Sequence, residues 1–191
     1  AATASLPFGF DISQELYDQC KKEQEVLKAC FLGNPDTQRA AFLEKLADKV
    51  AIDVYGNNWS RFTGHKNIQC FPEIRGDEFW KTLRKYRVQI NLMRIHNEDS
   101  HNMRTFEVPG IGGIMIAPKT TEHQAFFIDG REAFFYSNAN DCINCIQQIM
   151  AMNNQQSKII RNAARAASLQ KGYSYENRTK QVILAFEKLL E

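Results

Sequence analysis

Several features that would point to a class of function are missing from these 191 residues. Lysine and arginine number 24 against 22 aspartates and glutamates, so the net charge of +2 gives no strong basic field for nucleic acid. No apolar run is long enough to span a bilayer, and no secretory signal pattern is visible. Neither GxGxxG nor a Walker A sequence occurs, which disfavours a dinucleotide site and a P-loop. We therefore expect no nucleic-acid partner and no integral membrane segment.

Cysteines are few and follow no framework of pairs. There are five, an odd and scattered set: Cys20, Cys30, Cys70, Cys142 and Cys145. Such a set favours reduced thiols, and so a cytoplasmic protein. Cys142 and Cys145 form a CxxC within an amphipathic pattern, with neither the preceding strand of a redox motif nor a second pair for zinc. Ordinary helix positions are therefore the favoured interpretation.

The chain divides into a short lead-in and one domain. Residues 1–11 carry Pro7 and Gly9, no initiator Met precedes Ala1, and the segment reads as the remnant of an interdomain linker. Residues 12–191, in a chain that is 43% apolar, suit a single domain with a real core.

Strand-like and helix-like segments alternate over the first 140 residues. Short apolar runs at 26–32, 50–55, 68–71, 88–93, 114–117 and 133–136 predict strands, and amphipathic segments between them predict helices. The helix after the first strand is expected to be capped by Asn34 and to begin at Pro35. Three helices at about 139–152, 155–170 and 174–190 close the chain. This alternation predicts an α/β fold: a Rossmann-like parallel sheet with helices on both faces.

Ligands of such sheets bind at the carboxyl ends of the strands, near the point where the strand order reverses. Three loops should therefore converge there: residues 33–35, residues 94–101 and the corner that begins near His101. The first loop could face a sugar or phosphate, with Arg39 reaching in from the helix. Taken alone, however, its sequence favours a plainer interpretation, a strand-to-helix turn with a solvated Arg39. The second, from His96 to His101, carries metal-type ligands in no zinc spacing, so a polar loop is favoured over a metal site.

The corner, residues 101–117, reads as a turn, a short helix, two glycines and a buried strand. Ser100 or Asn102 can cap the helix, whose free N–H groups and positive dipole end attract an anion. Arg104 in its first turn adds a bidentate phosphate donor. These features predict that the corner holds the phosphates of a nucleotide, with Glu107 accepting from the ribose hydroxyls.

The same corner has a plainer interpretation. Arg104 and Glu107 stand three residues apart and could form a surface ion pair instead of a site, in which case Glu107 would not accept from ribose hydroxyls. Pro109 implies that the helix is short or bent, because proline removes a hydrogen bond inside a helix. The residues alone leave both interpretations open.

A family resemblance covers nearly the whole chain. Asn-Met-Arg-Thr-Phe-Glu-Val-Pro-Gly-Ile-Gly-Gly (102–113) closely resembles the signature of the spore maturation protein CgeB-like and group 1 glycosyltransferases, which have the two-domain GT-B fold. Residues 6–11 resemble their interdomain linker, residues 30–35 with Arg39 and residues 55–59 resemble two strand ends, and residues 173–178 resemble the end of the carboxyl-terminal half. The resemblance implies one half of a GT-B enzyme.

This resemblance implies a site for a nucleotide-diphosphate sugar, with a UDP-sugar favoured and no metal or cofactor. Arg104 and Glu107 would be the catalytic pair, with Glu107 also holding the ribose. Asp99 matches the first acid of the E-x7-E motif of related transferases but is Asp where they have Glu, which puts its contact with the donor sugar in doubt. The remaining binding residues implied are Gly33, Asn34, Arg39, Phe71, Ile74, Arg94, Met103 and Thr105, with Phe71 and Ile74 lining the base pocket.

The resemblance also implies that the acceptor-binding domain is missing from this chain, which would transfer sugar poorly or not at all. An epimerase of the same two-domain fold is an alternative, because it binds the same donor. A flavodoxin-like or response-regulator-like module is another, although a response regulator needs an acidic pair after the first strand, where Gly33 and Asn34 stand instead.

Overall fold

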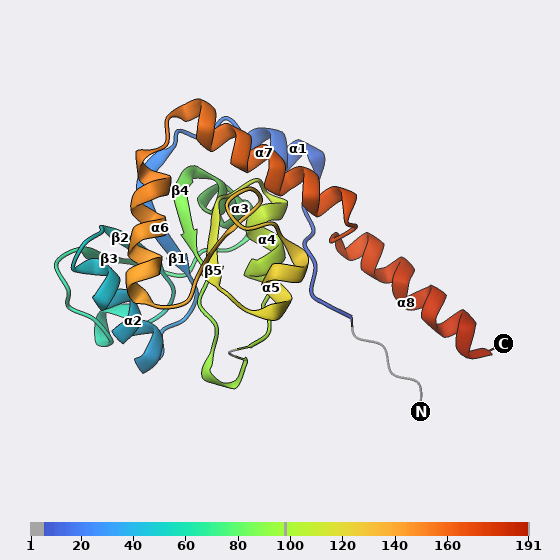
Figure 1. Cartoon of the computed structure of the whole chain (residues 1–191), viewed down its shortest axis with the longest axis horizontal. Coiled ribbons are helices and arrows are strands. Elements are labelled where there is room, and N and C mark those ends of the chain that lie inside the picture. The colour runs from blue at the N-terminus through green and yellow to red at the C-terminus, as the bar shows by residue number, and fades with distance from the viewer. Residues whose placement is uncertain (1–5, 98, 191) are drawn as a thin grey trace.

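The computed structural model describes residues 6–97 and 99–190, which form a six-stranded parallel sheet between helices (Figure 1). The strand order is β3-β2-β1-β4-β5-β6, and every neighbouring pair is parallel. The order reverses between β1 and β4, so the loops that follow these two strands meet at the carboxyl edge. The strands are β1 (Val26–Leu32), β2 (Ile52–Tyr55), β3 (Ile68–Phe71), β4 (Tyr86–Ile90), β5 (Met115–Pro118) and β6 (Phe134–Tyr136).

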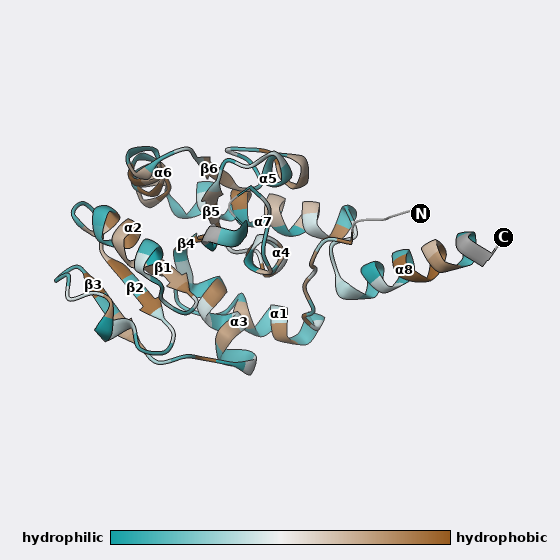
Figure 2. Cartoon of the chain, turned by 90° about the horizontal axis from the view of Figure 1, so that it is seen from below, coloured by the Kyte–Doolittle hydropathy of each residue, from teal (hydrophilic) through white to brown (hydrophobic). Residues whose placement is uncertain are grey.

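Helices cover both faces of the sheet because the strands are apolar on both sides. Along β1, Ala29 and Phe31 enter the core beneath α2 and α6, whereas Cys30 and Leu32 enter the core beneath α1, α3 and α4. Figure 2 shows β1 and β2 as mostly hydrophobic, as expected for strands buried on both faces. The helices are α1 (Gln14–Cys20), α2 (Thr37–Ala47), α3 (Gly76–Lys85), α4 (Arg104–Gly110), α5 (Thr121–Phe126), α6 (Ala139–Ala151), α7 (Asn154–Gln170) and α8 (Tyr175–Leu190), with 3-10 turns η1 (Trp59–Arg61) and η2 (Ile95–Asn97).

The predicted fold class is confirmed: the chain is a Rossmann-like α/β domain. One local prediction is wrong, because α2 begins at Thr37 and its cap is Asp36, not Asn34 with Pro35. The Asp36 carboxylate accepts from the Arg39 N–H at 2.9 Å, which places the helix start two residues later. The predicted strand 88–93 also begins and ends earlier, as β4.

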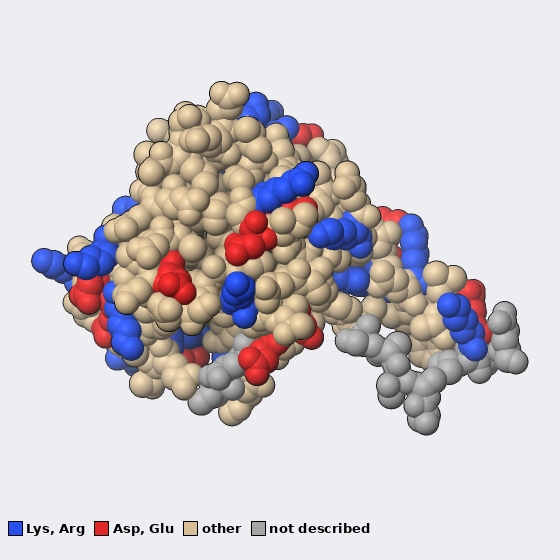
Figure 3. All heavy atoms as spheres, viewed as in Figure 1, with Lys and Arg blue, Asp and Glu red and all other residues tan. Residues whose placement is uncertain are grey.

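Within the part of the chain that the structure describes, no helix combines the length and apolarity needed to cross a membrane. Basic and acidic side chains are interspersed on the face shown in Figure 3, with no extended patch of one sign. Helix α8 projects away from the sheet (Figure 1).

The lead-in segment packs onto the domain. Phe10 is 2% exposed and forms a parallel bridge with Ser174: its N–H donates to the Tyr173 carbonyl at 3.1 Å, and its carbonyl accepts from the Tyr175 N–H at 3.0 Å. Residues 1–5 of the predicted linker lie outside the described residues, and the boundary at residue 11 stays a prediction.

Candidate functional site

A cavity of about 390 Å³ lies where the loops after β1 and β4 meet the start of α4. All three loops that the sequence predicted to converge contribute to its walls. Six predicted site residues line it: Gly33, Asn34, Arg39, Arg94, Met103 and Arg104. The cavity therefore sits at the switch point of the strand order, where parallel α/β sheets bind ligands.

Arg39 holds two loops of the cavity wall together and also contributes positive charge to the cavity. Its guanidinium donates to three backbone carbonyls, those of Leu92 (2.9 Å), Asn34 (3.1 Å) and Met93 (3.4 Å). These bonds tie the loop after β1 to the loop after β4. The solvated Arg39 of the plainer interpretation is thus not observed, and partial burial lowers the pKa of this guanidinium from its ordinary value.

Arg104 and Glu107 form an ion pair on α4, but not an exposed one. Their side chains are 24% and 14% exposed, and the Arg104 guanidinium also lies 4.5 Å from the Phe79 ring centroid and donates to the Leu32 carbonyl at 3.3 Å. Burial raises the pKa of Glu107, while the attraction of Arg104 acts to lower it. Arg104 therefore lines the cavity while it is paired with Glu107, which is not among the residues of the cavity wall.

The start of α4 is held by a buried network of polar side chains. The Thr105 hydroxyl lies 2.9 Å from Nε2 of His123 and accepts from Nδ2 of Asn91 and the N–H of Asn102, each at 3.2 Å. Nδ1 of His123 lies 2.8 Å from the Pro118 carbonyl, so this nitrogen carries the proton and Nε2 accepts from Thr105. Burial lowers the pKa of His123, in keeping with a neutral ring. The network fixes the position of the residues that border the cavity.

The amide groups at this helix start contribute less than the sequence predicted. The Thr105 N–H already donates to Asn102, to its carbonyl at 3.1 Å and its side-chain oxygen at 3.3 Å. In residues 6–97 and 99–190, only the N–H groups of Met103 and Arg104 in this turn lack an acceptor. Because α4 has only seven residues, the arginine side chains supply most of the positive charge here.

The other predicted site residues lie apart from the cavity walls. Phe71 stacks on Tyr55 with ring centroids 4.7 Å apart, and Ile74 packs against the core on the same side of the sheet. Asp99 is an exposed turn residue, and Thr105 is fully buried beneath the cavity. The roles that the resemblance implied for these residues, and for Glu107, stay predictions.

The polar loop from His96 to His101 is attached to the rest of the domain at its last residue, His101. His101 pairs with Glu122 through Nδ1, and its Nε2 accepts from the Phe8 N–H at 3.4 Å. Among the residues described, no three His, Cys, Asp or Glu side chains are grouped to hold a metal ion; Glu98 lies outside them. Cys142 is buried on α6, where burial raises its pKa, and all five cysteines are free thiols.

Several wall residues escaped the sequence reasoning: Phe8, Phe31, Leu32, Asn91, Leu92, Met93, Asn97 and Asn102. Asn91 follows β4 directly, so its place at a strand's carboxyl end was a usable signal. Phe8 had none, because it reaches the cavity through contacts with His101, 93 residues away.

Comparison with known structures gives the same fold. A glycosyltransferase from Rickettsia africae ESF-5 superimposes with a TM-score of 0.69 at 14% identity, over 95% of this chain and 53% of that one. Anabaena Alr3699/HepE in complex with UDP-glucose gives 0.67 at 13% identity, over 94% and 56%. TarM gives 0.67 at 16% identity, over 86% and 36%. The chain thus spans between a third and about half of the length of these GT-B glycosyltransferases.

No curated protein sequence matches the chain. A family model described as glycosyl transferase-like matches residues 38–183, which run from α2 through strands β2 to β6 to the first half of α8. The chain therefore belongs to the glycosyl transferase-like family.

Proposed function

We propose that this chain is the carboxyl-terminal, donor-binding half of a glycosyltransferase and that its cavity holds the diphosphate of a nucleotide sugar. The observation that carries the proposal is the group of arginines at the switch point: Arg39, Arg94 and Arg104 all line one cavity of about 390 Å³. A nucleotide diphosphate needs concentrated positive charge and directed donors, and arginine supplies both.

Arg104 is the residue proposed to act on the reaction itself. As the glycosidic bond to the diphosphate breaks, negative charge builds up on the leaving phosphate oxygens. A guanidinium already fixed by the Leu32 carbonyl, Phe79 and Glu107 stabilises that charge without reorganising. This chemistry requires no metal ion.

Glu107 is proposed to keep Arg104 oriented and to accept from the ribose hydroxyls once the donor is bound. Asn34, Gly33 and Met103 would contact the diphosphate or sugar from the walls. Thr105 would act from beneath, as part of the buried network that positions the turn. Contact of Asp99 with the sugar, and of Phe71 and Ile74 with the base, needs the loops at the carboxyl edge to close over the ligand.

A UDP-sugar is the favoured donor, supported by the Anabaena neighbour in complex with UDP-glucose. The closer kinship with CgeB-like enzymes belongs to the same proposal, resting on the motif at residues 102–113. So does a cytoplasmic place of action, supported by the five free thiols. The acceptor would be held by a separate amino-terminal domain, so this chain alone is expected to bind the nucleotide weakly and transfer sugar poorly.

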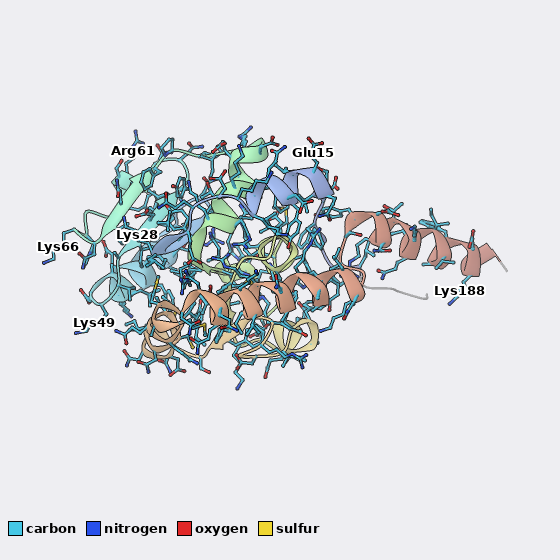
Figure 4. The ribbon with its side chains drawn as sticks, turned by 90° about the horizontal axis from the view of Figure 1, so that it is seen from above. Glu15, Lys28, Lys49, Arg61, Lys66 and Lys188 are labelled. Carbon is cyan, nitrogen blue, oxygen red and sulfur yellow. The ribbon has the colours of Figure 1, made fainter. Side chains whose placement is uncertain are left out.

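The experiment is calorimetric titration of the chain with UDP, GDP, ADP and CMP. UDP is expected to bind most tightly, and Arg104→Gln to weaken it about tenfold or more, the effect of losing one charge-assisted hydrogen bond. Glu107→Gln should weaken UDP more than CMP if the carboxylate also orients Arg104 toward the second phosphate. The control is Arg61→Gln, an exposed arginine at the end of the molecule remote from α8 (Figure 4).

Unchanged UDP affinity in both site variants would overturn the proposal. Two alternatives have their own signatures. An epimerase half would also bind UDP-sugars, but the full enzyme would convert the donor without an acceptor. A flavodoxin-like binding module would prefer a flavin mononucleotide and leave UDP unbound.

A further inference from the structure

A second cavity, of about 610 Å³, lies at the opposite edge of the sheet. It opens among the turn before β1, the end of α3 and the first turns of α7. Glu25 precedes β1 and Arg84 precedes β4, so the two cavities stand at opposite ends of the same two strands. Nothing in the proposed donor site uses this region.

Positive charge outweighs negative charge around this amino-terminal cavity. Four cations line it, Lys21, Arg84, Lys158 and Arg161, against two carboxylates, Glu23 and Glu25.

One of the two carboxylates is fully engaged. One Glu25 oxygen accepts from Arg161 at 2.8 Å, and the other accepts from Arg87, which lies behind the cavity. Neither Arg84 nor Lys158 has a carboxylate partner in the described part of the chain. Two of the four cations at this cavity, Arg84 and Lys158, thus have no ion-pair partner within the described residues.

Unused hydrogen-bond donors are concentrated in the same place. Four buried side-chain nitrogens in the described residues have no acceptor, and three of them are the Nε atoms of Arg84, Arg87 and Arg161. Arg161 is only 3% exposed, yet it lines the cavity. A buried donor without a partner costs free energy, so this cluster is short of acceptors. The three Nε atoms are themselves enclosed, and the terminal nitrogens of Arg84 are the donors that a ligand in the cavity could reach.

A purely structural role accounts for only part of this cluster. Arg161 donates to the carbonyls of Arg84 (2.8 Å), Tyr86 (2.9 Å) and Gly112 (3.2 Å), so it does clamp α7 to the sheet. Arg84, in contrast, makes no side-chain hydrogen bond within the residues described. Burial first, and then repulsion from the charge of Arg84, lower the pKa of Arg161 to about 10, while its pairing with Glu25 acts to raise it. An anion between α3 and α7 would relieve that repulsion.

We propose that this amino-terminal cavity binds a small soluble phosphate monoester or inorganic phosphate, held by Arg84 and Lys158 with Arg161 behind them. A phosphate offers several acceptor oxygens to donors that converge from two helices, and arginine matches its geometry. Asn154 and Ser157, in the first turns of α7, also line the cavity and complete a polar wall. The recessed position of Arg84 and Arg161 favours a free ligand over the headgroup of a lipid in a membrane.

The test is an NMR titration of the isotope-labelled chain with sodium phosphate at constant ionic strength. The backbone amides of Asn154 and Ser157 are expected to shift. Phosphate can also enter the arginine-lined donor cavity, and the amides of Asn34 and Met103 report that event separately. Binding followed at α7 should weaken about tenfold or more in Arg84→Gln and by a smaller factor in Lys158→Gln. Lys66→Gln, an exposed lysine far from α7, is the control (Figure 4).

Lys158 is exposed on α7, so its variant keeps the fold and the test remains decisive if Arg84→Gln unfolds. If Arg84 were merely structural, Arg84→Gln would lower the unfolding temperature, but added phosphate would still bind and stabilise the variant. If Arg84 belongs to the proposed site, added phosphate no longer raises the unfolding temperature of the variant. The proposal would be overturned if phosphate caused no shifts at α7 in the native chain. It would also be overturned if both variants bound phosphate at α7 as tightly as the native chain does. Co-sedimentation with phosphatidic acid vesicles that depends on Lys158 would overturn its assignment to a soluble ligand.

Discussion

Replacing Thr105 by valine should destabilise the domain although the two side chains have nearly the same shape. Thr105 is 0% exposed, and its hydroxyl interacts with three groups: Nε2 of His123, Nδ2 of Asn91 and the N–H of Asn102. Valine supplies none of these interactions and admits no water to replace them. A buried acceptor and two donors lose their partner at once.

The expected loss follows from that count. At about 0.5–1.5 kcal/mol for each neutral hydrogen bond, three of them amount to roughly 2–4 kcal/mol in the free energy of unfolding. For a domain of this size that corresponds to a fall of roughly 5–15 °C in Tm. Urea unfolding followed by circular dichroism measures the first quantity, and a thermal scan measures the second.

Thr82 provides a matched control. It is 2% exposed on α3, and in the described residues its hydroxyl makes no hydrogen bond, so Thr82→Val should change the free energy of unfolding by less than about 0.5 kcal/mol. If the two valine variants unfold at the same urea concentration, the network beneath the cavity contributes nothing and the reasoning fails.

Three further outcomes are expected. Gly56→Ala should cost about 2 kcal/mol or more, because its Cβ would lie 2.4 Å from the Gly33 carbonyl oxygen, whereas Gly64→Ala, with nothing within 4 Å, should be nearly neutral in urea unfolding. The lowered pKa of His123 means that its contribution to stability is present above the ordinary value of about 6.5 and is lost as the pH falls below it; His123→Gln should flatten that part of the stability profile, and an unchanged profile would contradict the assignment. Removing the opposing charge in Arg104→Gln should raise the pKa of Glu107 further, measured by NMR titration of the carboxyl carbon; a lower value would refute the pairing.

The fold was predictable because its local signals agree. Every predicted strand and every predicted helix exists, with ends shifted by a few residues, since apolar runs and turn residues mark them clearly along the chain. The error at the start of α2 has a local cause: Asn34 and Asp36 both precede the helix and both can cap it. Only the fold decides between them, because the Asn34 side-chain oxygen accepts from the Asn57 N–H at 3.4 Å and not from the helix.

The site was predictable only where the rule applies that ligands bind at the carboxyl ends of parallel strands. That rule located Gly33, Arg94 and Arg104 at one edge. It said nothing of interactions between residues far apart in the chain, such as Phe8 with His101, or Glu25 with Arg161 at a separation of 136 residues. Amphipathic periodicity places Arg161 on a helix but does not reveal that the helix buries it.

The bridge between Phe10 and the residues at the start of α8 joins the first and last described segments of the chain. Two backbone hydrogen bonds and the bond from Nε of Arg178 to the Phe8 carbonyl, at 3.3 Å, join the base of α8 to the lead-in segment. Phe8 also lines the cavity at the carboxyl edge of the sheet. The base of α8 and the wall of the cavity are therefore joined through a single residue pair, Arg178 and Phe8, and a partner that bound α8 and displaced its base would act on Phe8 through that bond.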